Sequence, residues 1–320
     1  MPASASAPAI RSDKRAFKAR LASVAHEIED LLEKLLGGDL EEREIARPAR
    51  LLKAMRYAVL SGGKRIRPFF VMETARLLNA KPQHAAMTAA ALECVHAYSL
   101  IHDDLPAMDN DALRRGRPTV HKAFDEATAI LAGDALLTFA FDLLAREQTH
   151  PDAGVRVALV AELARAAGIG GMAGGQLLDL AAEGRFGKVQ PGATAEDSVM
   201  MLEAMKTGAL IRAACGMGAI LGQASQAARG ALDSYGFALG QAFQIADDLL
   251  DLEGDPETMG KKTRKDAAAG KATFIAILGV DGARARLAAL VAEAEAALGQ
   301  FGEEAKMLRA AARFVAERRA

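Results

Sequence analysis

The amino-acid sequence predicts an all-α fold, and three observations support this prediction. Long Ala- and Leu-rich segments carry apolar residues at a three-and-four spacing, which is the period of an amphipathic helix. Strict alternation of polar and apolar residues, the pattern of a half-buried strand, is scarce throughout the chain. Hydrophobic residues make up 51% of the 320 residues, which is enough to fill a substantial core.

Composition narrows the classes of protein further. The net charge is -1 and the basic residues form no stripe, so we expect no nucleic-acid partner. No uninterrupted apolar run reaches the ~18 residues that span a bilayer, so we expect no membrane partner. The two cysteines, Cys94 and Cys215, lie in apolar segments, which is typical of reduced core thiols in a cytoplasmic protein.

The domain organisation is expected to be simple. Residues 1–12 have no hydrophobic signal core and should form a disordered tail, and residues 13–320 should form a single all-helical domain. The first helix should run from Lys14 to Leu36, because apolar residues recur three and four positions apart until Gly37 and Gly38. Further helices are expected at residues 49–60, 69–78, 129–147 and 155–168, and from Ser198 onward.

Four segments outside these helices have informative compositions. Residues 64–67 place three cations directly after the flexible Gly62–Gly63 pair, which is typical of a loop that contacts an anion. The Gly-rich residues 168–175 would permit close contact between helices. Residues 183–197 break the helical period with Gly and Pro and should form a surface loop. Residues 254–270 combine Gly, Pro and basic residues, which suits a lid that closes over phosphate.

The densest charge in the chain lies between His96 and His121. Crowded carboxylates at the end of an apolar helix are costly unless a cation neutralises them, and all-oxygen ligation suits Mg²⁺. Guanidinium groups match phosphate oxygens, so this segment suggests a metal-bridged diphosphate site, although charge-rich turns are also common on solvated surfaces. The acidic residues are Asp103, Asp104, Asp109 and Asp111, and the basic ones are Arg114, Arg115, Arg117 and, directly after the segment, Lys122.

A proline inside this acidic cluster predicts an irregular backbone. Asp103 and Asp109 are six positions apart, about 240° around an ideal helix, so an unbroken helix would point them in different directions. Pro106 lies between them and lacks the N–H that a continuous helix would use. We therefore expect residues 105–108 to unwind and bring Asp109 back towards Asp103.

A second acidic cluster lies far along the chain, within the sequence FQIADDLLD. At 3.6 residues per turn Asp247 and Asp251 share one helix face, with Asp248 beside it. The neighbouring residues are apolar, so these like charges are better explained by a cation site than by solubility. The alternative is an Asp-rich, exposed helix end.

These motifs carry a family resemblance. DDLPAMD and FQIADDLLD, with LRRG after the first, resemble the two aspartate-rich motifs of the trans-isoprenyl diphosphate synthases, and most closely those of the bacterial-type farnesyl diphosphate synthases. The resemblance runs from about Leu51 to the C-terminus. It implies a bundle of about ten or more helices around a central cavity, with the two motifs facing each other at its mouth. It also implies a homodimer, and three Mg²⁺ ions per active site when diphosphate is bound.

The resemblance assigns roles to individual residues. The allylic substrate is dimethylallyl or geranyl diphosphate; its partner, isopentenyl diphosphate, attacks the carbocation that forms, and released pyrophosphate removes the last proton. Asp103, Asp109 and Asp247 would bind Mg²⁺, and Asp104 belongs to the same catalytic motif. The implied contacts to isopentenyl diphosphate are Lys64, Arg67, His96 and Arg115; those to the allylic diphosphate and carbocation are Arg114, Lys206, Thr207, Gln244, Lys261 and Lys271. Arg264 departs from the family pattern in the lid, where Gly is frequent, and Asn110 interrupts a run that is often acidic.

Product length is predicted from Tyr98 and its neighbour Ser99. Tyr98 precedes Asp103 by five positions, about 7.5 Å lower along a helix, where a growing apolar tail would descend. In the family that this chain resembles, an aromatic residue here together with the Pro106–Ala107 insertion goes with a C15 product. We therefore expect farnesyl diphosphate, although Tyr98 could instead be an ordinary core residue.

Three alternatives remain open. The chain could make geranylgeranyl diphosphate, because its DNDALRRG region is equally similar to those enzymes. It could be a helical di-iron carboxylate redox protein, because Glu93 with His96 and Glu147 with His150 reproduce the spacing of such sites. It could also be a non-enzymatic regulatory subunit of a prenyltransferase, although such a chain would be expected to have lost some of the charged positions, and all are present.

Overall fold

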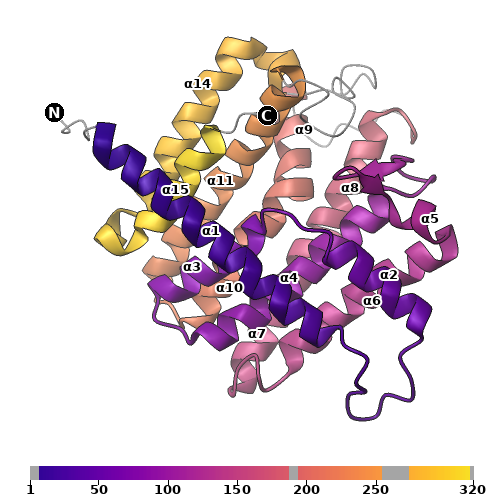
Figure 1. The fold of residues 1–320 in the computed structure, drawn as a ribbon. Helices are drawn as coiled ribbons and strands as arrows, with labels where there is room; N and C mark the ends of the chain where they lie inside the picture. Colours follow the sequence, from indigo (N-terminus) through magenta and orange to yellow (C-terminus); the bar gives the residue numbers. More distant parts are fainter. Residues whose placement is uncertain (1–6, 187–193, 254–273, 318–320) are drawn as a thin grey trace.

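The computed structural model describes residues 7–186, 194–253 and 274–317. The described residues form an all-α bundle of more than ten helices, as the sequence predicts (Figure 1). Among them the only strands are β1 (Leu113–Arg114) and β2 (Arg117–Pro118), which pair as a short antiparallel hairpin.

Helices account for most of the described residues. They are α1 (Ala7–Leu35), α2 (Ala49–Val59), α3 (Ile66–Leu77), α4 (Pro82–Asp103), α5 (Val120–Ala123), α6 (Glu126–Ala145), α7 (Ala153–Ala167), α8 (Met172–Ala182), α9 (Ala195–Glu203), the π-helix η1 (Ala204–Gly208), α10 (Ala209–Leu221), α11 (Gln226–Glu253), α14 (Phe274–Ala297), the 3-10 helix η2 (Gly299–Ala305) and α15 (Lys306–Ala316).

Helix α4 is the central element of the bundle. It packs against α1, α2, α3, α6, α7 and α10, and every residue from Ala85 to Val95 is buried. Alanine side chains are small enough to let so many helices approach one axis, which explains why this segment is apolar on all sides. The first acidic motif lies at the C-terminal end of this buried helix, so the core holds its backbone in place.

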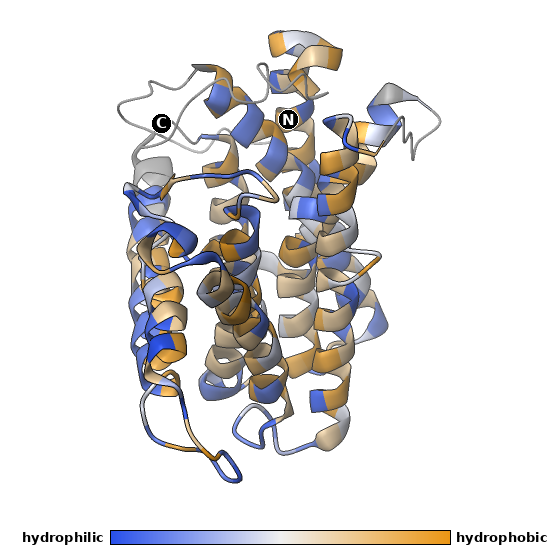
Figure 2. Ribbon diagram, turned by 90° about the vertical axis from the view of Figure 1, so that its right-hand side faces the viewer, coloured by the Kyte–Doolittle hydropathy of each residue, from blue (hydrophilic) through white to orange (hydrophobic). Residues whose placement is uncertain are grey.

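The neighbouring helices are amphipathic in the ordinary way. Figure 2 shows the long helices running side by side, with hydrophilic and hydrophobic residues following one another along each helix. On α1, for example, Phe17, Val24 and Ile28 are buried, which confirms the periodicity predicted for that segment. The core is therefore built from the apolar stripes that the sequence pattern identified.

The first helix begins earlier in the chain than predicted. Helix α1 begins at Ala7, so residues 7–12 belong to a helix and not to the disordered tail expected for residues 1–12. Pro8 lies in the first turn of α1, where its missing N–H would have had no intrahelical acceptor. No glycine or proline follows it before Gly37, so nothing in the sequence stops the helix from extending backwards.

Three described stretches are long and apolar enough, by length and composition, to cross a membrane: Glu126–Ala145, Ala153–Ala182 and Glu196–Leu221. The prediction of no membrane partner required an uninterrupted apolar run, and acids such as Asp134 and Asp142 interrupt the first stretch. In the bundle α6 packs against α2, α4 and α7, which accounts for much of its apolar composition. The absence of a membrane partner stays a prediction.

The two cysteines are core residues, as predicted. Cys94 and Cys215 are buried and unpaired by any disulfide. Burial raises the pKa of both thiols, that of Cys215 to about 12, so neither thiol is ionised at neutral pH.

Candidate active site

The first acidic motif leaves helix α4 in the way that Pro106 predicts. The helix ends at Asp103, and the Asp109 N–H then donates a 2.8 Å hydrogen bond back to the Asp103 carbonyl. Between them the Met108 N–H donates to the Leu105 carbonyl at 2.9 Å, which closes a tight turn. The unwinding of residues 105–108 is confirmed, and it places Asp109 beside the end of the helix that carries Asp103.

The surroundings of Asp103 disfavour the charged form of its carboxyl group. Its pKa is raised to about 6, chiefly because the carboxyl is buried; the Lys206 ammonium lowers the pKa and the neighbouring Asp109 carboxylate raises it. A carboxyl group in such a place becomes fully ionised when a cation lies next to it. The first motif is therefore suited to a hard metal ion.

Asp104 has a different partner from its neighbour. It is buried, and its carboxylate accepts hydrogen bonds from the Arg114 Nε at 2.9 Å and the Arg114 Nη2 at 2.6 Å. Arg114 lies on strand β1 of the β1–β2 hairpin. The two turn residues of this hairpin, Arg115 and Gly116, have φ values of 53° and 73°. Two positive φ values are typical of the tight type I′ turn. Asp104 thus fixes the orientation of Arg114, while Asp103 faces the cavity described below.

Three of the four residues predicted to bind isopentenyl diphosphate, Arg67, His96 and Arg115, lie near the Gly62–Gly63 turn. The Arg67 Nη1 donates to the His96 Nε2 at 3.3 Å, and the Arg115 Nη1 donates to the Gly62 carbonyl. Burial holds the pKa of His96 well below its ordinary value, and the positive charges of Arg67 and Arg115 lower it further. His96 is therefore neutral at pH 7 in the free protein, with its Nε2 as an acceptor.

The π-helix η1 carries the predicted Lys206–Thr207 pair. The Lys206 Nζ lies 2.5 Å from the Oδ2 of Asp179 on α8. The Thr207 hydroxyl donates to the Gln244 Oε1 at 3.1 Å, and the Gln244 Nε2 donates to the Asp248 Oδ1 at 2.9 Å. Because the Thr207 hydroxyl donates its hydrogen to Gln244, its oxygen lone pairs remain for another group. Single-turn π-helices occur frequently at functional sites.

Glycines allow these elements to approach each other. A Cβ on Gly175 of α8 would overlap the Lys206 backbone, so the close contact predicted for the Gly-rich residues 168–175 is confirmed. A Cβ on Gly240 of α11 would lie 2.7 Å from the Cα of Gly208 in η1. Both helices can therefore pack directly on η1 only because these positions lack side chains.

The second acidic motif lies on the face of α11 that is turned towards η1. Gln244, Asp247, Asp248 and Asp251 are three, four and seven positions apart, which places them on one helix face. Gln244 contacts Thr207, so this face is directed towards the same region as Lys206. Asp247 and Asp251 are partly exposed there, while Asp248 is buried.

A cavity of about 440 Å³ lies between α3, α4, α8 and η1. Both polar and apolar side chains line it. Tyr98 forms one wall, with its ring packed edge-on against His102 at a centroid distance of 5.7 Å. The predicted site residues that line the cavity are Arg67, His96, Tyr98, Ser99, Asp103, Lys206 and Thr207; its apolar lining includes Leu100, Met108, Met172, Leu177 and Leu180.

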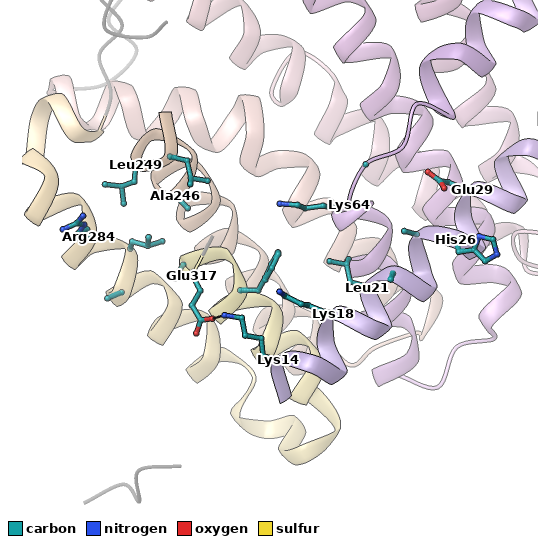
Figure 3. A pocket seen from close by; sticks show the side chains of 18 residues that line it. Lys14, Lys18, Leu21, His26, Glu29, Lys64, Ala246, Leu249, Arg284 and Glu317 are labelled. Carbon is teal, nitrogen blue, oxygen red and sulfur yellow. Dashed lines mark hydrogen bonds and ion pairs between the residues drawn. The ribbon is translucent and has the colours of Figure 1, made fainter. Parts of the chain in front are cut away.

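A larger cavity, of about 1380 Å³, lies between α1, α11, α14 and α15 (Figure 3). Lys64 extends into it, with the Nζ 5.8 Å from the centre of the Phe314 ring, and Lys14 pairs with Glu317 at its edge. Of the predicted site residues in the described part of the chain, Lys64 alone lines this cavity. We assign the chemistry to the smaller cavity, because an acid, a lysine and a hydroxyl meet above apolar walls there.

The donor set fits Mg²⁺ provided that the substrate supplies oxygens too. In the described residues no group of three or more His, Cys, Asp or Glu side chains is close enough to hold a metal ion by itself. Asp103 and Asp109 offer carboxylates from one turn, and Asp247 offers another from α11. Mg²⁺ is commonly bound by one or two carboxylates together with substrate phosphates, so a diphosphate between these elements would complete the coordination.

Some predicted residues cannot be placed, and others were missed. Lys261, Arg264 and Lys271 lie outside the described residues. The pairing of Asp179 with Lys206 was not predicted, because the two residues lie on separate elements, α8 and η1. The burial of Arg65 within the basic loop was also missed, because a run of basic residues usually indicates solvent exposure.

The contacts count against the di-iron alternative. Glu93 binds Arg65 at 2.6 Å, and His96 accepts from Arg67. Glu147 is exposed, while His150 packs against the ring of His84. The two predicted ligand pairs are therefore engaged separately and form no common metal site.

Comparison with known proteins decides the family. A model of the polyprenyl synthetase family matches residues 48–308. The chain belongs to this family. A prenyltransferase assignment follows from it, and the all-α fold of its members agrees with the bundle described above.

Individual members of the family are similar to this chain over most of its length. The farnesyl diphosphate synthase of Escherichia coli K12 is 46% identical over 257 residues, which cover 79% of this chain and 83% of the relative. The geranylgeranyl diphosphate synthase of Cyanophora paradoxa is 39% identical over 271 residues, covering 85% and 88%. The apo structure of an FPP/GFPP synthase from Zymomonas mobilis matches with a TM-score of 0.82 and 42% identity, covering 95% of this chain and 99% of that one.

Proposed function

We propose that this prenyltransferase condenses isopentenyl diphosphate with dimethylallyl or geranyl diphosphate and releases farnesyl diphosphate. The observation that carries this proposal is the 440 Å³ cavity, in which Asp103, Lys206 and Thr207 adjoin apolar walls. The farnesyl diphosphate synthases among the relatives support the same product. The reaction comprises ionisation, condensation and proton elimination.

The allylic diphosphate ionises when its leaving group is stabilised. Lys206 and Arg114 would donate to the diphosphate oxygens, and Asp179 and Asp104 hold these two cations in position. Asp103, Asp109 and Asp247 would hold Mg²⁺, which neutralises charge on the departing pyrophosphate. We also include Lys261 and Lys271 as diphosphate contacts from the proposed lid.

The carbocation that forms must be shielded from water. The apolar side chains that line the cavity would shield the cation from solvent, and the Thr207 oxygen would present a negative dipole end to it. Gln244 orients the Thr207 hydroxyl through their hydrogen bond. Isopentenyl diphosphate, bound by Arg67, His96 and Arg115, then attacks through its double bond, and pyrophosphate takes the proton that is lost. Lys64 stays a predicted contact of this diphosphate, although its side chain lines the larger cavity in this structure.

Tyr98 favours a C15 product. Its half-buried ring lies on the cavity wall five positions before Asp103, about 7.5 Å lower along α4, where the growing chain would have to pass. The alternative product, geranylgeranyl diphosphate, is supported by the relative from Cyanophora paradoxa. Product length therefore depends on how completely Tyr98 closes the path.

We further propose a cytoplasmic homodimer that binds neither nucleic acid nor membrane. Two large side chains on α6, Ile130 and Leu131, are 44% and 57% exposed, and a second copy of the chain would cover them. The net charge of -1 gives no attraction to nucleic acid or to anionic lipid.

One experiment tests the proposed function. The purified chain is incubated with geranyl diphosphate, isopentenyl diphosphate and Mg²⁺, and the dephosphorylated products are identified by chromatography and mass spectrometry. We expect farnesol as the main product. A main product of geranylgeraniol would transfer the assignment to the C20 alternative, and an absence of condensation would overturn the proposal.

A further inference from the structure

A buried arginine lies inside the basic loop that follows the Gly62–Gly63 turn. Arg65 is only 4% exposed, although Lys64 is exposed and Arg67 is partly so. It is the residue preceding α3, and its backbone is left-handed, with φ 46° and ψ 44°. A non-glycine residue rarely adopts this conformation, so something must hold it there.

The Arg65 guanidinium is held by three helices. Its Nη1 donates to the Glu93 Oε1 of α4 at 2.6 Å, and its Nη2 donates to the Glu29 Oε1 of α1 at 3.0 Å. The same Nη2 donates to the carbonyl of Val59, the last residue of α2, at 2.6 Å. A planar guanidinium can reach three acceptors at once, which an ammonium group cannot do with the same geometry.

These contacts fix the start of α3 relative to α4, close to Arg67 and His96, which are proposed to bind isopentenyl diphosphate. Glu93 precedes His96 by three positions on α4, so both lie on one side of that helix. Arg67 follows Arg65 by two positions and donates to His96 at 3.3 Å. A small cavity of about 40 Å³ is lined by Arg65, Glu93, His96 and Arg115 together. The buried ion pair therefore adjoins the group that would receive isopentenyl diphosphate.

We propose that Arg65, held by Glu93 and Glu29, is a positioning residue that sets Arg67 against His96 and so controls affinity for isopentenyl diphosphate. This inference rests on the proposed function and adds to it a residue that touches no substrate. The groups proposed for the allylic substrate lie on η1, α11, the end of α4 and, in the case of Arg114, strand β1. Arg65 donates its hydrogen bonds to Glu93, Glu29 and Val59 and to none of these groups. The two substrates should therefore respond differently to a change at Arg65.

The test uses mild substitutions, because removing one partner of a buried ion pair is strongly destabilising. Arg65→Lys keeps the charge but loses the planar fork. Glu29→Gln keeps the shape at the most exposed member, whose side chain is 35% exposed. Arg56→Lys is the matched control, because Arg56 also joins α2 to α1, through Glu33 at 2.9 Å, but contacts none of the binding residues.

The measurements are the Kd of isopentenyl diphosphate alone, by calorimetry, and the KM of each substrate. For Arg65→Lys we expect the Kd and KM for isopentenyl diphosphate to rise at least tenfold, while the KM for geranyl diphosphate changes less than twofold. Glu29→Gln should change the same two constants by about threefold, and Arg56→Lys should leave all of them unchanged.

Several outcomes would overturn the inference. Unchanged constants in Arg65→Lys, or an equal rise for both substrates, would show that the ion pair serves only the fold. If Arg65→Lys is insoluble, unchanged constants in Glu29→Gln lead to the same conclusion. If the unaltered chain binds no isopentenyl diphosphate, the proposed function itself fails, and that result is distinct from the others.

Discussion

Neighbouring residues in the first acidic motif have separate tasks. Asp103 lines the cavity beside Lys206, whereas Asp104 is buried and binds Arg114. Successive residues on a helix differ by about 100° in direction, so the two carboxylates point to different surroundings. The metal ligands proposed for this motif are accordingly Asp103 and Asp109.

Replacement of one carboxylate in either motif should abolish turnover. We expect Asp103→Ala and Asp247→Ala each to lower kcat at least 10³-fold, a loss of about 4 kcal/mol of transition-state stabilisation. Circular dichroism and thermal unfolding should show that the fold is kept. Asp39→Ala, at an exposed acid in the loop after α1, is the control and should have normal activity. Near-normal activity in both motif variants would contradict the metal assignment.

Tyr98 should limit the length of the product. We expect Tyr98→Ala to shift the product from C15 towards C20 and longer chains, because it removes a ring from the cavity wall. Tyr98→Phe keeps the ring and should keep the C15 product. Chromatography of the dephosphorylated products distinguishes these results. An unchanged product in Tyr98→Ala would show that other residues form the floor.

Contacts between residues close together in the sequence could be predicted, whereas contacts between distant residues could not. The return of Asp109 to Asp103 could be predicted because Pro106 acts within one turn of the chain. The pairing of Asp104 with Arg114 depends on a hairpin whose register the sequence did not reveal. The pairing of Lys206 with Asp179, and of Arg65 with Glu93, joins separate helices, and no local pattern encodes such contacts.

At the scale of elements, the site depends on how closely α8 and α11 approach η1. We expect Gly240→Val to destabilise the fold by about 1–3 kcal/mol, because its Cβ would lie 2.7 Å from the Gly208 Cα. The displacement should also separate Gln244 from Thr207 and lower kcat. Urea unfolding and steady-state kinetics measure the two effects.

A second glycine on the same helix provides the control. Gly230 on α11 has no atom within 4 Å of an added Cβ. Gly230→Ala should therefore leave activity unchanged and stabilise the helix by about 0.5–1 kcal/mol. Full stability and activity in Gly240→Val would contradict the packing argument.

Element boundaries were predicted less well than element type. The end of α1 agrees with the prediction to one residue, because Gly37 and Gly38 are strong local signals. Its start was placed seven residues too late, because Pro8 is compatible with a first helical turn and gives no stop signal. Helix α6 likewise begins at Glu126, where the Asp125 carboxylate accepts from the Thr128 N–H at 2.7 Å.

At the scale of the whole molecule, the all-α class followed from apolar periodicity alone. Which helix occupies the centre did not, because α4 is buried on most sides and has little amphipathic pattern to read. The cavity was expected from family resemblance, since its shape depends on how α3, α4, α8 and η1 pack together. Sequence reasoning thus identified the chemical groups, and packing determined which of them meet.

The central claim is that the two acidic motifs bind one metal-bound diphosphate. Calorimetric titration with pyrophosphate, with Mg²⁺ and then with EDTA, tests it most directly. We predict binding only with Mg²⁺, at least 100-fold weaker binding in Asp103→Asn and in Asp247→Asn, and no further loss in the double variant. Binding that persists in EDTA, or that is unaffected by either substitution, would contradict the claim.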